Sequence, residues 1–254
     1  MVPIAQSAAQ PAEAEGPVAF FKAQHQGFLD TFSAYRAKPD LLDRVWMQAF
    51  TSFERNVADQ THQLPVLACR KGCGTCCQIL VAATAPEVLM VARYVRGMAA
   101  GFKNVGIDLV GRLYGAADFV EPSGNVRPMA LVRECPFLAE GICVIYPVRP
   151  LACRGHASFD EEACVSALEG GLDNVPVSEP HRTVRGLVQN ALQSAMRDAG
   201  FAWGLYDLVA ALKIALARPD CEADFANGGD PFATVALDVV SRDEMESTFD
   251  RLKS

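Results

Sequence analysis

Cysteines are the residues of this sequence best suited to do chemistry, and eight of the nine fall within two segments. The first segment reads Cys69-Arg-Lys-Gly-Cys73-Gly-Thr-Cys76-Cys77, and the second runs from Cys135 to Cys164. Packing alone does not require sulfur at this density, whereas thiolates bind zinc and iron–sulfur clusters well. The pattern therefore predicts a metal site with the ligands Cys69, Cys73, Cys76, Cys77, Cys135, Cys143, Cys153 and Cys164.

The spacing of the cysteines leaves the metal open between zinc and an iron–sulfur cluster. Eight thiolates could fill two four-coordinate zinc sites, or one iron–sulfur cluster and a second ion. Adjacent side chains diverge, so Cys76 and Cys77 are expected to serve different centres or to divide into one ligand and one supporting thiol. The spacing differs from that of standard zinc fingers. The glycines flanking Cys73 and the Cys135-Pro136 step are compatible with iron–sulfur binding.

Basic residues adjoin both cysteine segments, although the chain has a net charge of -7. Cations lower the pKa of thiols and offset the negative charge of a thiolate site. Arg149 and Arg154 are therefore predicted to help bind the cofactor by contacting its ligands. His156 is a further candidate, either as a ligand or as a partner of a ligand. Cys221 lies apart from the two segments and is interpreted as a core residue.

Helices are expected to position the cysteines, which gives a mainly α fold with a loop-rich, metal-stabilised cysteine-cluster core. Thr84-Ala-Pro-Glu87 matches a capping box and should begin a helix that ends near residue 100. Asp40 can cap another helix. The prolines at 136, 147 and 150 exclude a regular helix around them. The remaining helices are predicted over residues 18–37, 40–63, 107–119, 157–168, 179–199, 204–217, 231–239 and 242–252.

The chain divides by composition into four parts: a disordered leader (1–17), N-terminal helices (18–65), a cysteine-cluster metal-binding domain (66–165) and a C-terminal helical region packed on it (166–254). The acidic balance argues against a nucleic-acid partner, because affinity for phosphates rests on clustered cations. No apolar run reaches the roughly 20 residues that span a bilayer, and the leader lacks the features of a secretory signal. Free clustered thiols then predict a cytoplasmic location.

Four stretches resemble a known family. They are Cys73-Gly-Thr-Cys76-Cys77, Cys135-Pro-Phe-Leu, Cys143-Val-Ile-Tyr-Pro-Val-Arg149-Pro150 and Cys153-Arg154. In this order they resemble the bacterial YkgJ-like cysteine-cluster proteins over about residues 66–165. The resemblance implies a zinc- or iron-chelating CxxCxxCC domain. The first gap, from Cys69 to Cys73, holds three residues where the family pattern has two, and Gly72 could absorb the insertion.

Three functional hypotheses follow. The first is a metal-binding protein whose zinc or iron–sulfur cluster has a structural or redox role. The second is an enzyme that modifies a partner protein, because a related branch resembles flagellin lysine N-methylases, in which such a domain accompanies methylation and an iron–sulfur centre. The third is metal storage or delivery. A metal ion is the expected partner throughout, whereas catalysis and a protein substrate belong to the second hypothesis.

Overall fold

The computed structural model describes residues 16–116, 134–170, 175–238 and 240–254. Within these ranges the chain forms ten α-helices and two short two-stranded sheets, so the predicted mainly α fold is confirmed. In the described part of the chain, every helix is too short or too polar to cross a bilayer. The first helix begins at Pro17, and residues 1–15 of the expected leader lie outside the described residues.

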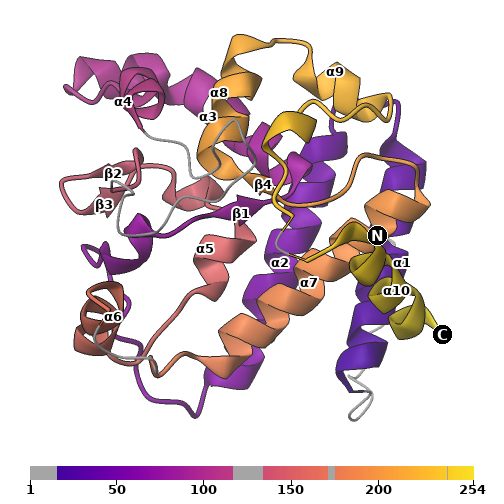
Figure 1. Cartoon of the computed structure of the whole chain (residues 1–254), viewed down its shortest axis with the longest axis horizontal. Coiled ribbons are helices and arrows are strands. Elements are labelled where there is room, and N and C mark those ends of the chain that lie inside the picture. The colour runs from indigo at the N-terminus through magenta and orange to yellow at the C-terminus, as the bar shows by residue number, and fades with distance from the viewer. Residues whose placement is uncertain (1–15, 117–133, 171–174, 239) are drawn as a thin grey trace, which may run out of the picture.

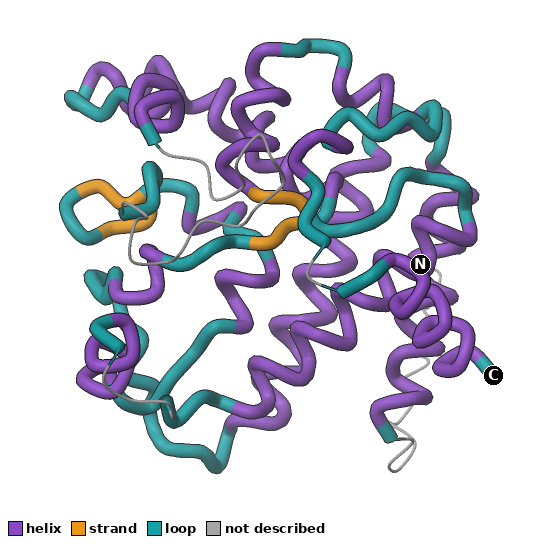
Figure 2. The backbone as a smooth tube through the Cα atoms, viewed as in Figure 1, coloured by secondary structure: helices purple, strands orange, loops and turns teal. Residues whose placement is uncertain are grey.

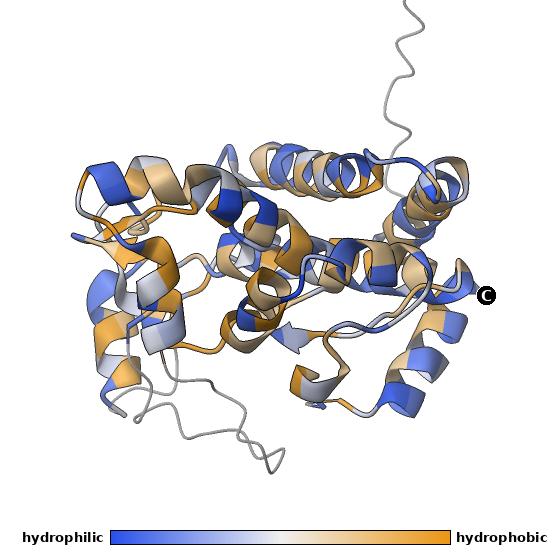
Figure 3. Ribbon diagram, turned by 90° about the horizontal axis from the view of Figure 1, so that it is seen from above, coloured by the Kyte–Doolittle hydropathy of each residue, from blue (hydrophilic) through white to orange (hydrophobic). Residues whose placement is uncertain are grey.

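Four long helices form the frame of the molecule (Figure 1). They are α1 (Pro17–Tyr35), α2 (Leu41–Thr61), α3 (Ala85–Asn104) and α7 (Glu179–Asp198). The α7 helix packs against α1, α2 and the short helix α5 (Leu151–Gly155). Apolar residues recur at helical spacing on these elements, and α1 buries Phe21, Phe28 and Phe32 completely. The helices are hydrophobic on one side and hydrophilic on the other (Figure 3), so burial of the apolar faces drives their packing.

Shorter helices complete the fold around this frame. They are α4 (Leu109–Gly115), α6 (Glu161–Leu168), α8 (Leu208–Ala217), α9 (Cys221–Ala226) and α10 (Arg242–Lys253). The α8 helix packs on α3, and α10 packs on α1 and α7. The carboxylate of Asp198 anchors α10, because it pairs with His25 of α1 at 3.0 Å, Arg197 at 3.0 Å and Lys253 at 2.6 Å. Three helices therefore meet at one carboxylate.

The two sheets join segments that are either distant or adjacent in sequence (Figure 2). Strand β1 (Ala82–Ala83) pairs antiparallel with β4 (Tyr206–Asp207), which links the start of α3 to the start of α8. Strand β2 (Leu138–Ala139) pairs with β3 (Ile142–Cys143) in a hairpin. The hairpin turn is Glu140-Gly141, with φ of 51° and 74°. Positive φ at both turn residues matches the right-handed twist of a two-residue hairpin.

The structure corrects several predicted elements. Asp40 precedes α2, but its side chain caps no backbone N–H and instead accepts a hydrogen bond from Arg44 Nε at 3.0 Å. The helix predicted over 231–239 is wrong, because the described residues there form one 3₁₀ turn, η4 (Ala233–Val235), and Ala236 is extended. Helix α9 was not predicted. The helix predicted over 107–119 is shorter, and residues 117–119 lie outside the described residues.

The second cysteine segment contains more helix than its prolines predicted. Pro147 lies in the first turn of the 3₁₀ turn η3 (Tyr146–Val148), and α5 begins directly after Pro150. The first residues of a helix donate no intrahelical hydrogen bond, so proline costs little there. Helix α6 begins at Glu161 rather than near residue 157, because Asp160 accepts a hydrogen bond from Ala163 N and caps the helix.

Candidate metal centre

The first cysteine segment is a compact turn between α2 and α3. Gly72 has a φ of 93°, and Cys73 N donates to Arg70 O at 3.0 Å, which closes the turn. Cys76 and Cys77 lie in the 3₁₀ turn η1 (Thr75–Gln78), where Cys77 N donates to Gly74 O at 2.9 Å. Glycine tolerates the positive φ that other residues avoid. Four thiols are thus presented by one small loop structure.

Two connections bring the second segment to the first. Cys135 N donates to Cys77 O at 2.7 Å, so the hairpin carrying Cys143 begins beside η1. Further along the chain, Ser158 N donates to Cys69 Sγ at 3.3 Å, and Ala68 N donates to Ser158 O at 3.0 Å. Helix α6, which carries Cys164, packs against η1. The fold therefore gathers cysteines from both segments on one loop-rich side of the molecule (Figure 2).

Side chains from the surrounding helices hold the carbonyl groups of this loop-rich region. Arg112 of α4 donates from Nε to Pro136 O at 2.8 Å, and Tyr94 of α3 donates to Val144 O at 3.2 Å. Glu87 of α3 accepts a hydrogen bond from Leu151 N, the first residue of α5, at 2.7 Å. Backbone polar groups need such partners where no regular secondary structure supplies them. Helix α5, with Cys153, is thereby fixed against α3.

Arg154 is a buried cation whose donors are directed at backbone and at α2. Its Nε donates to Arg149 O at 2.9 Å, and its Nη2 donates to Pro147 O at 3.0 Å. Its Nη1 pairs with Glu54 at 3.0 Å, and its guanidinium lies 3.8 Å from the centre of the Phe50 ring. Burial and the neighbouring Arg149 lower the pKa of Arg154 to about 10. Arg154 therefore holds the turn before α5 against α2.

Arg149 acts on more of the thiols than Arg154, whose charge acts on Cys143 alone among Cys76, Cys143 and Cys153. Arg149 helps to lower the pKa of Cys76, and it partly opposes the burial that raises the pKa of Cys143 and of Cys153. Its guanidinium lies 4.1 Å from the centre of the exposed Tyr146 ring. In the part of the chain that the structure describes, Arg149 Nε is buried and has no hydrogen-bond partner. An unpaired buried donor beside thiols suits an anionic centre that could accept its hydrogen bond.

Burial dominates the protonation of the other thiols. It raises the pKa of Cys135 to about 11, and it also raises the pKa of Cys143 and of Cys153. Cys76 and Cys77 influence each other's protonation. Interaction with the Cys77 thiol lowers the pKa of Cys76 to about 7, and interaction with the Cys76 thiol, together with burial, raises the pKa of Cys77. A cation and a partner thiol thus make Cys76 the thiol that ionises most readily among these five.

All eight clustered cysteines are free thiols, and Cys69 is exposed while the other seven are half-buried. Among the described residues, no three side chains of His, Cys, Asp or Glu are already positioned to hold one metal ion. The donor set nevertheless suits zinc or iron in its chemistry, since it combines soft sulfur donors with a facing cation. An ion would have to draw the thiolates together.

The stretch that contains both cysteine segments matches a known protein family. Residues 68–169 match the CxxCxxCC family model. That family is described as "Putative zinc- or iron-chelating domain". The predicted resemblance to a cysteine-cluster family is therefore confirmed for this segment. The search of curated proteins and the search of solved structures gave no match.

The CxxCxxCC domain spans all eight clustered cysteines, together with Arg149 and Arg154. It excludes Cys221, which is buried in α9 as expected of a core residue. His156 is exposed and directly follows α5, and partial desolvation of its imidazole and the charge of Arg185 lower its pKa. Ser158, whose backbone N–H bonds to Cys69 Sγ, carries no signal in the sequence, because no local pattern marks a contact across 89 residues.

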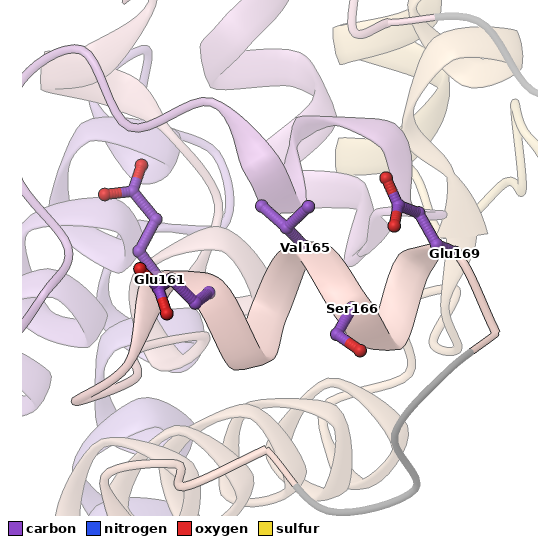
Figure 4. Close-up of a pocket in the computed structure, with 5 residues that line it drawn as sticks. Glu161, Val165, Ser166 and Glu169 are labelled. Atoms are coloured by element: carbon purple, nitrogen blue, oxygen red, sulfur yellow. The ribbon is translucent and has the colours of Figure 1, made fainter.

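A surface groove follows α6, the helix that carries Cys164 (Figure 4). Its lining residues are Glu161, Glu162, Val165, Ser166 and Glu169, which come from this helix and its C-cap. A protein-modifying enzyme would need a substrate groove beside the cysteines, with the C-terminal helices as its wall. Those helices contribute no residue to the lining of this groove.

Proposed function

We propose that the CxxCxxCC domain of this protein chelates zinc or an iron–sulfur cluster, and that the metal has a structural or redox role. The observation that carries the proposal is the buried, unpaired Nε of Arg149 among thiols from two separate segments. Without a thiolate centre, this donor and the buried thiols gain little from their proximity. With a thiolate centre, the donor acquires an anionic acceptor.

The proposed ligands are the eight clustered cysteines, with Arg149 as the residue that bonds to them. When bound, the metal would cross-link loops that contain little regular secondary structure, and an iron–sulfur cluster would also supply one-electron chemistry. The protein's part is to hold the donors close. The bond between Cys135 N and Cys77 O and the contacts of Arg112 and Arg154 serve this purpose.

The first test is metal and acid-labile sulfide analysis of protein purified without oxygen, together with its visible absorption spectrum. The wild type should carry iron with sulfide and be brown, or carry zinc and be colourless. Cys76→Ala and Cys153→Ala should lose bound metal, whereas Cys221→Ala should keep it because Cys221 lies in α9. Folded wild-type protein that binds neither metal under reducing conditions would refute the proposal.

A second measurement separates the structural role from the redox role. A structural zinc site makes folding depend on the metal, so removing the metal with a chelator should lower the unfolding midpoint strongly. A redox cluster should bleach reversibly on reduction while the helical circular dichroism stays unchanged. Metal that leaves without affecting either stability or spectrum would exclude both roles.

A further inference from the structure

A short extended segment, residues 157–159, lies between α5 and α6. It pairs antiparallel with residues 176–178, where a bridge joins Ser158 to Val177. The two backbone hydrogen bonds of this pairing, at 3.0 and 2.8 Å, are made by the residues that flank the bridge. In such a pair the N–H and C=O groups of the bridged residues point away from the partner segment. The backbone polar groups of Ser158 therefore face the opposite side, where they meet the first cysteine segment.

Cys69 supplies the acceptor for the N–H of Ser158. Ser158 O accepts a hydrogen bond from Ala68 N at 3.0 Å, as in an ordinary pair of extended segments. Ser158 N, however, donates to Cys69 Sγ at 3.3 Å rather than to a carbonyl oxygen. Ser158 is 2% exposed, so water has little access to this N–H and the sulfur must satisfy it. The side chain of Cys69 thus takes the place of a backbone carbonyl.

The strength of this hydrogen bond depends on the state of the sulfur. A neutral thiol accepts hydrogen bonds weakly, whereas a sulfur that carries negative charge accepts a stronger, charge-assisted bond. Metal ions bind cysteine as the thiolate. The S–H group of a free Cys69 could reach Ser158 O at 3.8 Å, which is too long for a strong bond. The N–H of Ser158 is therefore best satisfied when the sulfur of Cys69 is bound to a metal.

The donor is fixed to the frame of the molecule. Ser158 Oγ donates to Pro176 O at 3.0 Å and accepts a hydrogen bond from Asp160 N at 3.1 Å. Residues 176–178 then lead directly into α7. Cys69, in contrast, is exposed, so its side chain could otherwise adopt any of its staggered rotamers. The N–H of Ser158 thus restrains an exposed thiol from a fixed position.

We propose that the backbone N–H of Ser158 positions Cys69 as a metal ligand and stabilises its sulfur in the metal-bound form. Ser158 is accordingly a positioning residue of the metal centre. This role rests on the proposed function, because it requires that the CxxCxxCC domain binds metal. It adds that Cys69 binds the metal although three residues, rather than two, separate it from Cys73. Bound metal then strengthens the link between the first cysteine segment and the start of α7.

The test uses Cd²⁺, a diamagnetic and thiophilic ion whose bonds to thiolates absorb in the ultraviolet. Ser158→Pro removes both the N–H and the hydroxyl of this residue, whereas the matched control Ser158→Ala removes the hydroxyl alone. Hydrogen-bond partners of metal ligands contribute about 10–100-fold to metal affinity. By competition with a chelator, the apparent Kd for Cd²⁺ should therefore be about 10–100-fold higher in Ser158→Pro than in Ser158→Ala.

The same comparison in a Cys69→Ala background separates positioning from stability. If the N–H acts through Cys69, the difference in Kd between Ser158→Pro and Ser158→Ala should disappear once the sulfur is absent. A merely structural N–H would keep its effect. A second readout is the amide proton resonance of Ser158 in ¹⁵N-labelled protein. It should shift downfield when Cd²⁺ binds to the wild type, because the hydrogen bond strengthens, and it should not do so in Cys69→Ala.

The outcomes distinguish this role from the proposed function. A folded, reduced wild type that binds neither Cd²⁺ nor zinc or iron contradicts the proposed function itself. Cd²⁺ binding with equal Kd values in Ser158→Pro and Ser158→Ala leaves that function intact and overturns the role of Ser158, as does a difference that persists in Cys69→Ala. Circular dichroism establishes that each variant has folded. If Ser158→Pro does not fold, the amide resonance decides: no response to Cd²⁺ in the wild type, or an equal response in Cys69→Ala, overturns the role.

Discussion

Replacement of Arg154 by alanine is the sharpest test of how the cysteine segment is held in place. The side chain of Arg154 is 3% exposed, and its two closest carbonyl partners, Arg149 O and Pro147 O, lie 2.9 and 3.0 Å from its nitrogens. Each buried carbonyl left without a donor costs about 1–3 kcal/mol. Loss of the contact with the Phe50 ring adds about 1–2 kcal/mol.

These favourable contacts of Arg154 are offset in part, because burial and the neighbouring Arg149 disfavour the charged guanidinium. Its pKa falls from 12.5 to about 10, which corresponds to a cost of about 3 kcal/mol for keeping the charge in the folded protein. Arg154→Ala removes this cost together with the favourable contacts. We therefore expect the free energy of unfolding to fall by about 2–4 kcal/mol, since the unmatched carbonyls and the lost packing outweigh the relief.

Two further variants identify which contacts of Arg154 matter. Glu54 is 49% exposed in its side chain, so Glu54→Gln should cost less than about 1 kcal/mol. Arg154→Lys keeps the charge but loses the planar set of donors, and its cost should lie between those of the other two variants. This order assigns the stabilisation to the carbonyl bonds rather than to the ion pair.

Urea unfolding in the presence of a chelator and a reductant measures these differences without a contribution from bound metal. Circular dichroism reports the helices, and fluorescence of Trp46, which lies beside Arg154, reports the local environment. A loss below about 1 kcal/mol for Arg154→Ala would show that the carbonyl bonds are dispensable. An equal loss in Glu54→Gln would show that the ion pair dominates.

Three further changes test other contacts. A Cβ at Gly155 would come close to the Cβ and Cγ of Arg185, so Gly155→Ala should lower the free energy of unfolding by about 1–3 kcal/mol. The control is Gly186→Ala, whose Cβ would meet open space and which should be neutral or stabilising by up to about 1 kcal/mol. Equal urea midpoints for the two variants would contradict the close packing of α5 on α7. Burial favours a raised pKa for Asp198, but its hydrogen-bonded partners Lys253, Arg197 and His25 outweigh burial and lower the pKa below 3.8. The stabilisation is therefore present above pH 3.8 and lost as the pH falls, so Asp198→Asn should cost about 1 kcal/mol at neutral pH and progressively less in acid. A cost that does not change with pH would argue against the ion pairs. Glu87→Gln replaces one of the two carboxylate oxygens that accept hydrogen bonds from Thr84 N and Leu151 N with an NH₂ donor. The change should lower the free energy of unfolding by about 1–3 kcal/mol. An unchanged thermal midpoint would show that the contact with α5 does not stabilise the fold.

Local patterns in the sequence were enough to predict the long helices. The apolar spacing of α1, α2 and α7 and the Thr84–Glu87 pair at the start of α3 act within a few residues, and Thr84 N does donate to Glu87 Oε2 at 2.8 Å. Where local signals compete, the prediction was wrong. Asp40 is a good capping residue by type, but in the folded chain Arg44 takes its carboxylate.

The chemistry of the cysteine segment was also predictable from sequence, because ligand type and density are properties of residue identity. The match of residues 68–169 to the CxxCxxCC family, described as a zinc- or iron-chelating domain, agrees with this interpretation. The distinct roles of Arg149 and Arg154 were not separable from sequence, since both are arginines in the same proline-rich stretch. They differ because α2 offers Glu54 and Phe50 to Arg154, while Arg149 remains beside the thiols.

By itself, the sequence of this protein determined which residues could bind metal and which segments would be helical, because both follow from residue type and short-range spacing. Tertiary structure alone decided which thiols are neighbours. Cys77 meets Cys135 across 58 positions, Cys69 meets Ser158 across 89, and β1 meets β4 across more than 120. Such contacts depend on how all the helices pack at once, and no local pattern in the chain encodes that arrangement.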